Sequence, residues 1–456
     1  KQHELQTISD SVDVANLKRG IELKEKEIIH SLCNYSDFTK GLDTDWKDVQ
    51  ERLRRGDVAI EFVELDKSIM SPNDTSLYYG AVLIKKEWRT PKFVLLHDKQ
   101  ITDSIIRNVI IDFKEAEDKA YNIEEWDRVN HQLYEMIWEP IFSYLEPNDC
   151  IYFSPVGMLS LAPMEILQDT KGRLMNEQYK LYRMSSTKYM CLSHNPVKKG
   201  NAVLYGGLKY DEDGNVDSSQ SKNSLKREGW NYLPSSATEI MVLDSIFRTA
   251  NISTNIYDNY AGTEESFKKL SGKTISTLHI ATHGFYFNED ESSFYDFFRD
   301  MNIRVKRGKG ISTLLRSGLM LSGGQHAWLH GRKDIPQDKE DGILLASEIS
   351  LLDFHNVDLV TLSACQTGLG DISDDGVMGL QRGFKRAGVN SILMTLWPVN
   401  DDATRLLMGE FYRNLVSGLT KLQSLHLAQK YLRESNVEYN NPYYWASFIL
   451  LDDLKQ

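Results

Sequence analysis

Short, strongly apolar runs alternate with amphipathic stretches through the second half of this chain. The runs read as strands and are NAVLYGGL (201–208), TLHIATHG (277–284), LVTLSACQTG (359–368) and SILMTLWPV (391–399). Strands this apolar are buried on both faces, which requires helices on both sides of a largely parallel sheet. The alternation therefore predicts an α/β fold.

Helix signals lie between these runs. Ser236 followed by Glu239 predicts a capping box at the start of one helix. GVMGLQRGFKRAG (376–388) predicts a second helix that ends at Gly388, and further helices are expected from Asp402 and from Thr420, with Gln423 as its capping partner.

The pattern of apolar and polar residues changes twice along the chain, which predicts three segments. Residues 1–55 are polar with apolar positions at helical spacing, and we expect a helical segment that is the end of a repeat region. Residues 56–198 contain strand-like runs and one amphipathic helix, which predicts an α/β subdomain. A linker at 195–200 leads to the third segment, 199–456, which carries the alternation described above.

Composition limits the classes of partner. The net charge of -12 disfavours direct nucleic-acid binding, because a duplex would repel such a surface. The apolar runs are too short for a membrane helix, and the four cysteines form no C-x-x-C pair or disulfide framework. We expect a cytoplasmic protein without membrane contact. The sequence starts at Lys1 rather than Met, and we expect it to be part of a longer protein.

His279 and His283 stand four residues apart in an apolar run. On a strand at ~3.3 Å per residue they are about 13 Å apart, too far to bind one ion, so no metal is expected. His279 reads as an internal residue. His283 ends its strand before Gly284, and ligands in open α/β sheets bind beyond such strand ends. From position alone, an anchoring role for His283 in its loop stays equally open.

Cys365 ends another apolar run. A lone cysteine is usually a small buried hydrophobe, and that interpretation stays open for Cys365 alone. A histidine and a cysteine at the ends of two strands can meet at one sheet edge, where the imidazole takes the thiol proton. The backbone N–H groups of Gly284 and Cys365 are then candidates for an oxyanion hole.

Two carboxylates follow the run that ends in LWPV. Asp401 and Asp402 are candidates for binding a cationic substrate side chain. A structural interpretation is equally available, because Asn400 or Asp401 can cap the next helix.

In order along the chain, these motifs resemble the CHAT domain, a caspase-like cysteine peptidase domain often attached to tetratricopeptide repeats. HIATHGF (279–285) is similar to the family's histidine motif and TLSACQTGLG (361–370) to its cysteine motif. Further matching stretches are FSPVGMLSLAPMEIL (153–167), EDGILLASEI (340–349), 376–404 and NPYYWASFIL (441–450).

The resemblance implies a His283–Cys365 catalytic dyad and a caspase-like mixed, mainly parallel sheet flanked by helices. A smaller α/β pseudo-peptidase half and the N-terminal helical segment would precede it. In the related separases an aspartate in a similar setting selects arginine. Asp401 is the matching position here, with Asp402 as second choice, for the pocket that binds the residue before the cleaved bond. The chain would be the C-terminal part of a protein with tetratricopeptide repeats and a CHAT domain.

We therefore predict a cysteine endopeptidase that cleaves after arginine or lysine, needs no cofactor, and is regulated by its N-terminal repeat region or by a protein partner. Two alternatives stay open: a catalytically silent signalling scaffold with a peptidase fold, and another thiol acyl-transfer enzyme. The long aromatic and acidic segment between Phe285 and Gly342 is expected to be a loop that covers the site.

Overall fold

The computed structural model describes most of the chain after residue 43. The described ranges are 44–69, 76–115, 123–192, 200–211, 229–287, 292–301, 313–336, 338–363, 378–398, 400–435 and 439–454. Of the predicted helical segment 1–55, only residues 44–55 fall within them, and they contain helix α4 (Trp46–Arg52).

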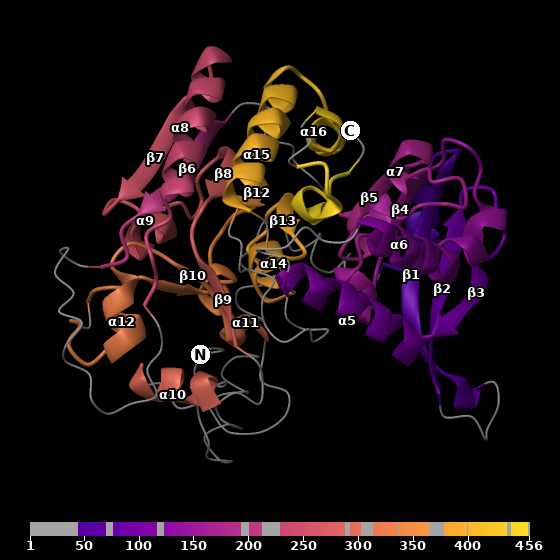
Figure 1. Cartoon of the computed structure of the whole chain (residues 1–456), viewed down its shortest axis with the longest axis horizontal. Helices are drawn as coiled ribbons and strands as arrows, with labels where there is room; N and C mark the ends of the chain where they lie inside the picture. Colours follow the sequence, from indigo (N-terminus) through magenta and orange to yellow (C-terminus); the bar gives the residue numbers. More distant parts are fainter. Residues whose placement is uncertain are drawn as a thin grey trace. The chain divides into compact units, whose positions relative to one another are not determined.

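The chain forms two compact units (Figure 1). The described residues between 195 and 390 make the first, and those of 44–194 and 391–454 make the second. The domain boundaries predicted from the sequence, at 55/56 and 198/199, stay a prediction.

The first unit is built on four parallel strands in the order β12-β8-β6-β7. Their bounds are β6 Asn201–Leu208, β7 Thr254–Asn259, β8 Ile275–Ile280 and β12 Val357–Leu362. A smaller antiparallel sheet, β11-β10-β9, consists of β9 Gly284–Tyr286, β10 Ser317–Met320 and β11 Ile343–Leu345. Its helices are α8 Pro234–Thr249, α9 Glu264–Lys268, α10 Ser292–Asp300, α11 Thr313–Arg316, α12 Gly324–His330, α13 Ala346–Ile349 and α14 Met378–Arg386.

The second unit contains seven strands in the order β3-β2-β1-β4-β5-β14-β13. Their bounds are β1 Asp57–Asp66, β2 Leu77–Lys85, β3 Lys92–Asp98, β4 Cys150–Ser154, β5 Lys180–Arg183, β13 Ser391–Thr395 and β14 Phe448–Leu451. The pairs β1–β4, β4–β5 and β5–β14 are parallel, and the other three are antiparallel. Its helices besides α4 are α5 Lys99–Glu115, α6 Ile123–Ile137, α7 Met175–Gln178, α15 Asp401–Val416 and α16 Lys421–Ser435.

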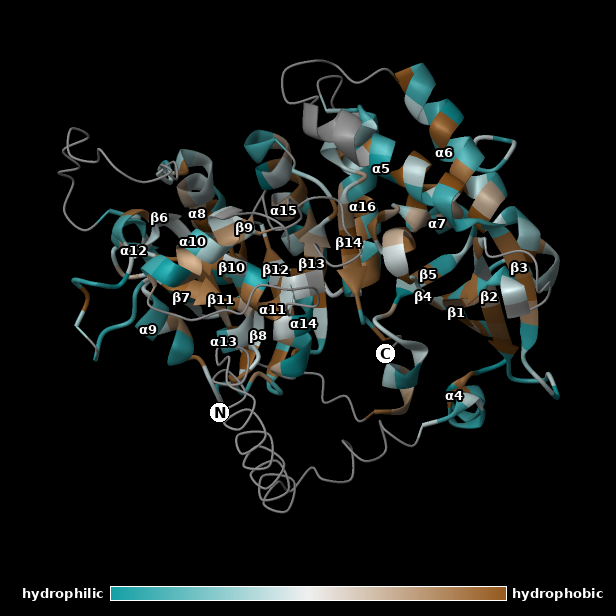
Figure 2. Ribbon diagram, turned by 90° about the horizontal axis from the view of Figure 1, so that it is seen from below, coloured by the Kyte–Doolittle hydropathy of each residue, from teal (hydrophilic) through white to brown (hydrophobic). Residues whose placement is uncertain are grey.

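Burial explains why the apolar runs became strands. Every residue of β4 and β13 is buried, and β12 is buried except for Asp358. Figure 2 shows strands that are mostly brown and helices that carry teal on much of their surface. The predicted architecture of a mixed, mainly parallel sheet flanked by helices is confirmed.

Two glycines let helix α8 approach the end of β6. A Cβ on Gly206 would lie 2.7 Å from the backbone oxygen of Ser236, and one on Gly207 would lie 2.7 Å from the Cβ of Ala237. The Gly207 N–H donates to the Ser236 hydroxyl at 2.9 Å. The start of α8 is therefore fixed against the carboxyl end of the sheet.

The predicted capping box at this helix is wrong. Helix α8 begins at Pro234, and Leu233 is its N-cap residue. Since Ser236 already lies inside the helix, its hydroxyl donates to Leu233 O, and Glu239 turns into the protein interior. The box predicted at Thr420 does form, because the Gln423 N–H donates to Thr420 Oγ1 and the Thr420 N–H donates to Gln423 Oε1, both at 3.2 Å.

The stretch 153–167 forms the interior of the second unit. Arg183 is almost fully buried, and its guanidinium makes two 2.8 Å contacts with the Glu165 carboxylate. The same guanidinium donates to the backbone oxygens of Ser160 and Ala162. A buried arginine of this kind is tolerated only when its donors are satisfied, so this stretch has a structural role.

Candidate active site

His283 lies just beyond the carboxyl end of β8, between that strand and β9. Its half-buried ring contacts the rings of Trp230 and Tyr210, with centroid distances of 4.9 Å and 5.2 Å. Its Nε2 atom lies 2.7 Å from the backbone oxygen of Asn231. A carbonyl oxygen only accepts, so Nε2 carries a proton, and in the neutral ring Nδ1 is the basic nitrogen.

Hydrogen bonds fix the backbone on either side of this ring. The Thr282 hydroxyl donates to Met320 O at 2.6 Å, so the Tyr210 hydroxyl is the donor in its 2.9 Å bond to Thr282 Oγ1. The Met320 N–H donates to the backbone oxygen of His283 at 2.8 Å. Burial, as the largest cause, raises the pKa of Tyr210 to about 12, so its hydroxyl keeps its proton at neutral pH.

Gln325 connects the two aromatic neighbours of His283. The backbone N–H of Trp230 donates to the Gln325 side-chain oxygen at 2.6 Å, and the backbone N–H of Gln325 donates to Tyr210 O at 2.9 Å. Three chain segments thus hold the imidazole: the residues after β6, the residues before α8, and helix α12. An orientation held this firmly is what a general base requires.

Strand β12 runs beside β8 in parallel, with Leu362 paired to Ile280. The next residue, Ser363, donates its N–H to Ile280 O at 2.9 Å. His283 and Cys365 each follow the Leu362–Ile280 pair by three residues in the sequence. Cys365 itself lies outside the described residues.

Glu239 joins β8 and β12 from helix α8. Its buried carboxylate accepts the Ser363 hydroxyl at 2.8 Å and lies 3.0 Å from His279 Nε2. His279 is fully buried on β8, as expected of an internal residue. The sequence analysis missed this role of Glu239, because its spacing after Ser236 matched a helix cap.

The other predicted site residues lie at two places. Gly284 opens β9 and pairs with Leu319 of β10. Asp401 and Asp402 belong to the second unit and form the first turn of α15. Asn400 is the helix cap, because its side chain accepts from the N–H groups of Asp402 at 3.0 Å and Ala403 at 3.2 Å. Asp402 is exposed and 3.3 Å from Arg405.

The segment between Phe285 and Gly342 is not one structureless loop. Its described residues include β9, β10 and helices α10, α11 and α12. A cluster of aromatic rings packs within it, with Phe287 and Trp328 stacked at 5.8 Å. His326 and His330 lie on helix α12.

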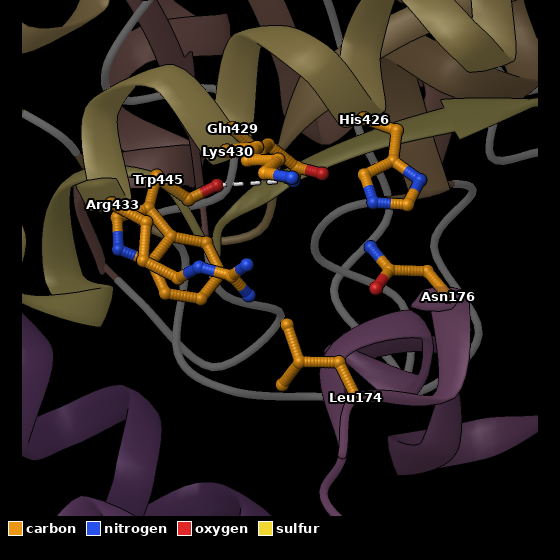
Figure 3. Close-up of a pocket in the computed structure, with 7 residues that line it drawn as sticks. All are labelled: Leu174, Asn176, His426, Gln429, Lys430, Arg433 and Trp445. Carbon is orange, nitrogen blue, oxygen red and sulfur yellow. Dashed lines mark hydrogen bonds between the residues drawn. The ribbon is translucent and has the colours of Figure 1, made fainter. Parts of the chain in front are cut away.

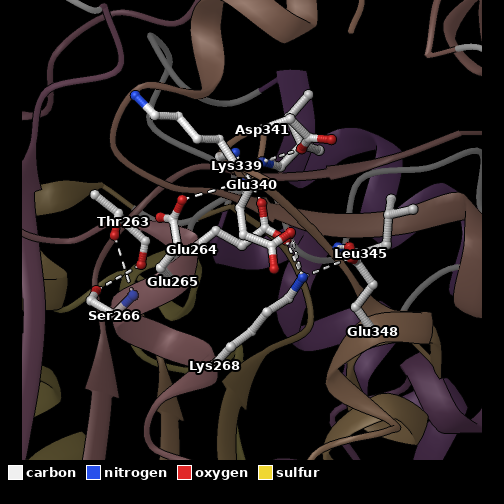
Figure 4. A network of polar contacts seen from close by, with 12 residues as sticks. Thr263, Glu264, Glu265, Ser266, Lys268, Lys339, Glu340, Asp341, Leu345 and Glu348 are labelled. Atoms are coloured by element: carbon white, nitrogen blue, oxygen red, sulfur yellow. Dashed lines mark hydrogen bonds and ion pairs between the residues drawn. The ribbon is translucent and has the colours of Figure 1, made fainter. Parts of the chain in front are cut away.

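A charged cluster fixes the stretch EDGILLASEI (Figure 4). Lys268 Nζ lies 2.6 Å from Glu264, 2.9 Å from Glu340 and 3.0 Å from Glu348. Within the described ranges, these three glutamates are the only group of three or more potential metal ligands. The lysine ammonium contacts all three carboxylates and balances part of their charge.

Burial, together with the charges of Glu348 and Asp341, raises the pKa of Glu264 well above its ordinary value. Burial alone would lower the pKa of Lys268, but the charges of Glu348 and Glu264 outweigh it and raise that pKa. Glu264 also accepts the Gly342 N–H at 2.9 Å, so the cluster holds the entrance to β11.

The second unit contains a small pocket of its own (Figure 3), lined by Leu174, Asn176, His426, Gln429, Lys430, Arg433 and Trp445. Burial lowers the pKa of His426. Arg433 is 2.7 Å from Glu177 and lies over the Trp445 ring at 5.8 Å. The pocket shares no residue with the surroundings of His283.

Comparison with known proteins identifies the family. The CHAT domain pattern matches residues 127–453, which is most of the chain. The chain belongs to the CHAT domain family. The resemblance noted from the separate motifs is thereby confirmed.

Two curated relatives match a part of this CHAT chain. Tetratricopeptide repeat protein 28 of Mus musculus is 37% identical and that of Homo sapiens is 34% identical, each over 109 residues. The match covers 24% of this chain and 4% of either relative.

The fold is similar to that of separase. In the crystal structure of the Saccharomyces cerevisiae separase–securin complex at 3.0 Å resolution, one chain matches with a TM-score of 0.50 and 10% identity. The match covers 91% of this chain and 30% of that chain. The CHAT chain therefore has a caspase-like peptidase fold. Among its described residues, no helix has the length and apolar character needed to cross a membrane.

Proposed function

We propose that this CHAT chain is a cysteine endopeptidase in which His283 activates the thiol of Cys365. The observation that carries the proposal is the parallel pairing of Leu362 with Ile280, since the two residues lie at the ends of β12 and β8. Both predicted catalytic residues follow that pair at the same sequence distance. The carboxyl ends of parallel strands form the sheet edge where α/β proteins bind ligands, which supports the proposal.

The orientation of His283 supports its role as the base. Because Nε2 donates to Asn231 O, the other ring nitrogen, Nδ1, receives the thiol proton. The Cys365 thiolate then attacks the carbonyl carbon of the scissile peptide bond, and the negative charge moves to the carbonyl oxygen. The N–H groups of Gly284 and Cys365 stabilise that oxyanion.

The remaining steps return the enzyme to its starting state. The tetrahedral intermediate collapses, the C–N bond breaks, and the leaving amine takes the proton from His283. Water, deprotonated by His283, attacks the thioester and releases the new carboxylic acid, and the proton returns to the thiolate.

We further propose that the substrate carries arginine or lysine before the cleaved bond. Asp401 would bind this cation, with Asp402 as the second choice. Both carboxylates lie at the start of α15 with Asn400 as the cap residue, so capping does not require either side chain.

We also propose that a protein partner or repeat region regulates the activity. The names of the two curated relatives refer to tetratricopeptide repeats, and the separase of the structural match was crystallised in complex with securin. Both observations support control by protein contacts, within the cytoplasm as expected from the sequence.

Cleavage of a peptide library with varied residues before the scissile bond tests the proposed function. The wild-type chain should cleave after arginine or lysine, and His283→Asn and Cys365→Ala should not. Equal cleavage by wild type and Cys365→Ala would refute the peptidase. Labelling of Cys365 without peptide cleavage would favour another thiol acyl-transfer enzyme.

A further inference from the structure

Helix α12 (Figure 1) carries two histidines about one turn apart. His326 and His330 stand at positions i and i+4 of the helix, so their side chains project from the same side. Their ring centroids are 5.2 Å apart, with the ring planes at 49°. His330 is exposed and His326 is half-buried, whereas Ala327 and Trp328 between them are buried. The pair therefore lies on the solvent-facing side of α12.

A spacing of four residues has opposite consequences on a strand and on a helix. Along an extended strand at ~3.3 Å per residue, two such histidines are too far apart for one ion. On a helix their Cβ atoms are about 5–6 Å apart. With zinc–nitrogen bonds of about 2.0–2.1 Å in a tetrahedral arrangement, two bound imidazoles have their centroids about 5 Å apart. The 5.2 Å between the rings of His326 and His330 agrees with that value.

The two imidazoles have no competing polar partner. Among the residues that the structure describes, neither ring makes a hydrogen bond or an ion pair, and the two rings contact each other. By contrast, His283 contacts a backbone oxygen and His355 contacts the Asp353 carboxylate. The nitrogens of His326 and His330 can therefore turn toward a common ion without giving up a polar contact.

The backbone that carries the two histidines is fixed at both ends of α12. In the first turn, the backbone N–H of Gln325 donates to Tyr210 O at 2.9 Å. At the other end, the Gly331 N–H donates to Ala327 O at 2.8 Å, and an added Cβ on Gly331 would clash with the backbone oxygen of Asp300. Because the helix is already ordered, an ion that binds the pair restricts only the two side chains.

The donor atoms select the kind of ion. Imidazole nitrogens suit zinc and the neighbouring transition metals, whereas Mg²⁺ and Ca²⁺ prefer oxygen ligands. Within the described part of the chain, no third histidine, cysteine, aspartate or glutamate completes a cluster with this pair. Water would therefore fill the remaining positions, and a site with two protein ligands binds more weakly than a structural zinc site with four.

We propose that His326 and His330 chelate one Zn²⁺ ion on the surface of α12. Each neutral imidazole donates one nitrogen to the ion, and water completes the coordination. The ion bridges successive turns of α12 and stabilises the helix that Gln325 anchors to Tyr210. The proposal does not depend on peptidase activity.

Modification by diethyl pyrocarbonate, which acylates neutral imidazole, tests the site in the wild-type chain. Mass spectrometry of peptides measures the rate at each histidine with and without ZnCl₂. With free zinc at about ten times the dissociation constant, modification of His326 and His330 should slow together by roughly tenfold. His97, a single exposed histidine on β3, should react at an unchanged rate, and MgCl₂ should protect neither member of the pair.

Isothermal titration with ZnCl₂ tests the contribution of each ligand. His326→Gln and His330→Gln each keep a good helix former and remove one nitrogen ligand. Loss of an outer partner of a metal ligand already costs about 10–100-fold in affinity, so loss of a ligand should weaken binding at this site by about tenfold or more. The matched control His97→Gln should bind zinc as the wild type does, and so should Glu264→Gln in the cluster around Lys268.

Four results would overturn the proposal: a wild type that binds no zinc, protection of only one of the two histidines, equal protection of His97, or wild-type affinity and stoichiometry in both His326→Gln and His330→Gln. Loss of the ion in Glu264→Gln alone would also overturn it, in favour of the carboxylate cluster. Far-UV circular dichroism checks the fold of each variant, and the modification experiment decides without any variant.

Discussion

The Nε2 atom of His283 lies 2.7 Å from the backbone oxygen of Asn231, in the segment that leads into helix α8. This contact and the rings of Trp230 and Tyr210 fix the imidazole. A misplacement of about 1 Å can reduce a rate about a hundredfold.

We therefore expect Trp230→Ala to lower kcat about tenfold to a hundredfold while the fold stays intact. Tyr210→Phe keeps the ring and removes only the hydroxyl that donates to Thr282, so its effect should be smaller. Steady-state kinetics on a cleaved peptide, with thermal melts as the control, separate the two variants. A Trp230→Ala variant with the wild-type kcat would contradict this account of how His283 is oriented.

Glu239 is expected to stabilise the end of β12. Glu239→Ala leaves the buried Ser363 hydroxyl without its acceptor and should lower the free energy of unfolding by about 1–3 kcal/mol. Glu239→Gln keeps a side-chain oxygen in place and should cost less. Urea denaturation measures both, and equal losses for the two variants would show that the acceptor oxygen is unimportant.

The cluster around Lys268 predicts a pH dependence of stability. The pKa of Glu264 is raised in the folded chain, so the folded state binds its proton more tightly than the unfolded state does. This contribution is complete below about pH 4.5 and decreases as the pH rises toward the folded pKa. The raised pKa of Lys268 contributes stability that is complete below about pH 10.5 and decreases only above it, so it adds no pH dependence at lower pH.

Glu264→Gln removes this dependence, since the amide does not titrate. Melting temperatures of wild type and Glu264→Gln should therefore differ in pH dependence, with wild type losing stability relative to the variant as the pH rises above 4.5. A relative gain over that interval would contradict the sign of the shift.

Substitutions at Asn400 and Asp401 should affect different properties, the stability of the chain in the first case and its substrate specificity in the second. Asn400→Ala removes the cap of α15 and should cost about 1 kcal/mol of stability without changing the residue preferred before the cut. Asp401→Asn should leave the stability unchanged and weaken the preference for arginine. Cleavage of paired arginine and alanine peptides measures the preference. If Asp401→Asn still prefers arginine, Asp401 is not the specificity residue.

The long apolar strands were predictable because a strand that is buried on both faces appears in the sequence as an uninterrupted apolar run. This pattern located β6, β8, β12 and β13, and with them the end of the strand before His283. Parallel strands place their carboxyl ends at the same edge of a sheet, which is why the ends of β8 and β12 could be expected at one edge.

Tertiary interactions explain what the sequence analysis missed. Strands β9, β10 and β11 have three or four residues each, too few to display an alternation. Glu239 fits a capping pattern locally, but its carboxylate lies beside Ser363, 124 residues away. The contact of Lys268 with Glu348 likewise joins residues 80 positions apart.

The central claim is that His283 activates the thiol of Cys365, and alkylation kinetics test it most directly because they need neither a substrate nor an activator. Cys150 and Cys191 are buried, and burial raises the pKa of the Cys191 thiol, so both serve as slow internal references.

The measurement is the rate of iodoacetamide modification of each cysteine as a function of pH, followed by mass spectrometry of peptides in wild type and His283→Ala. Cys365 should react fastest in wild type, with an apparent pKa below the ~8.5 of an ordinary thiol, and that advantage should disappear in His283→Ala. An unreactive Cys365, or equal rates and equal pH profiles in the two proteins, would contradict the account.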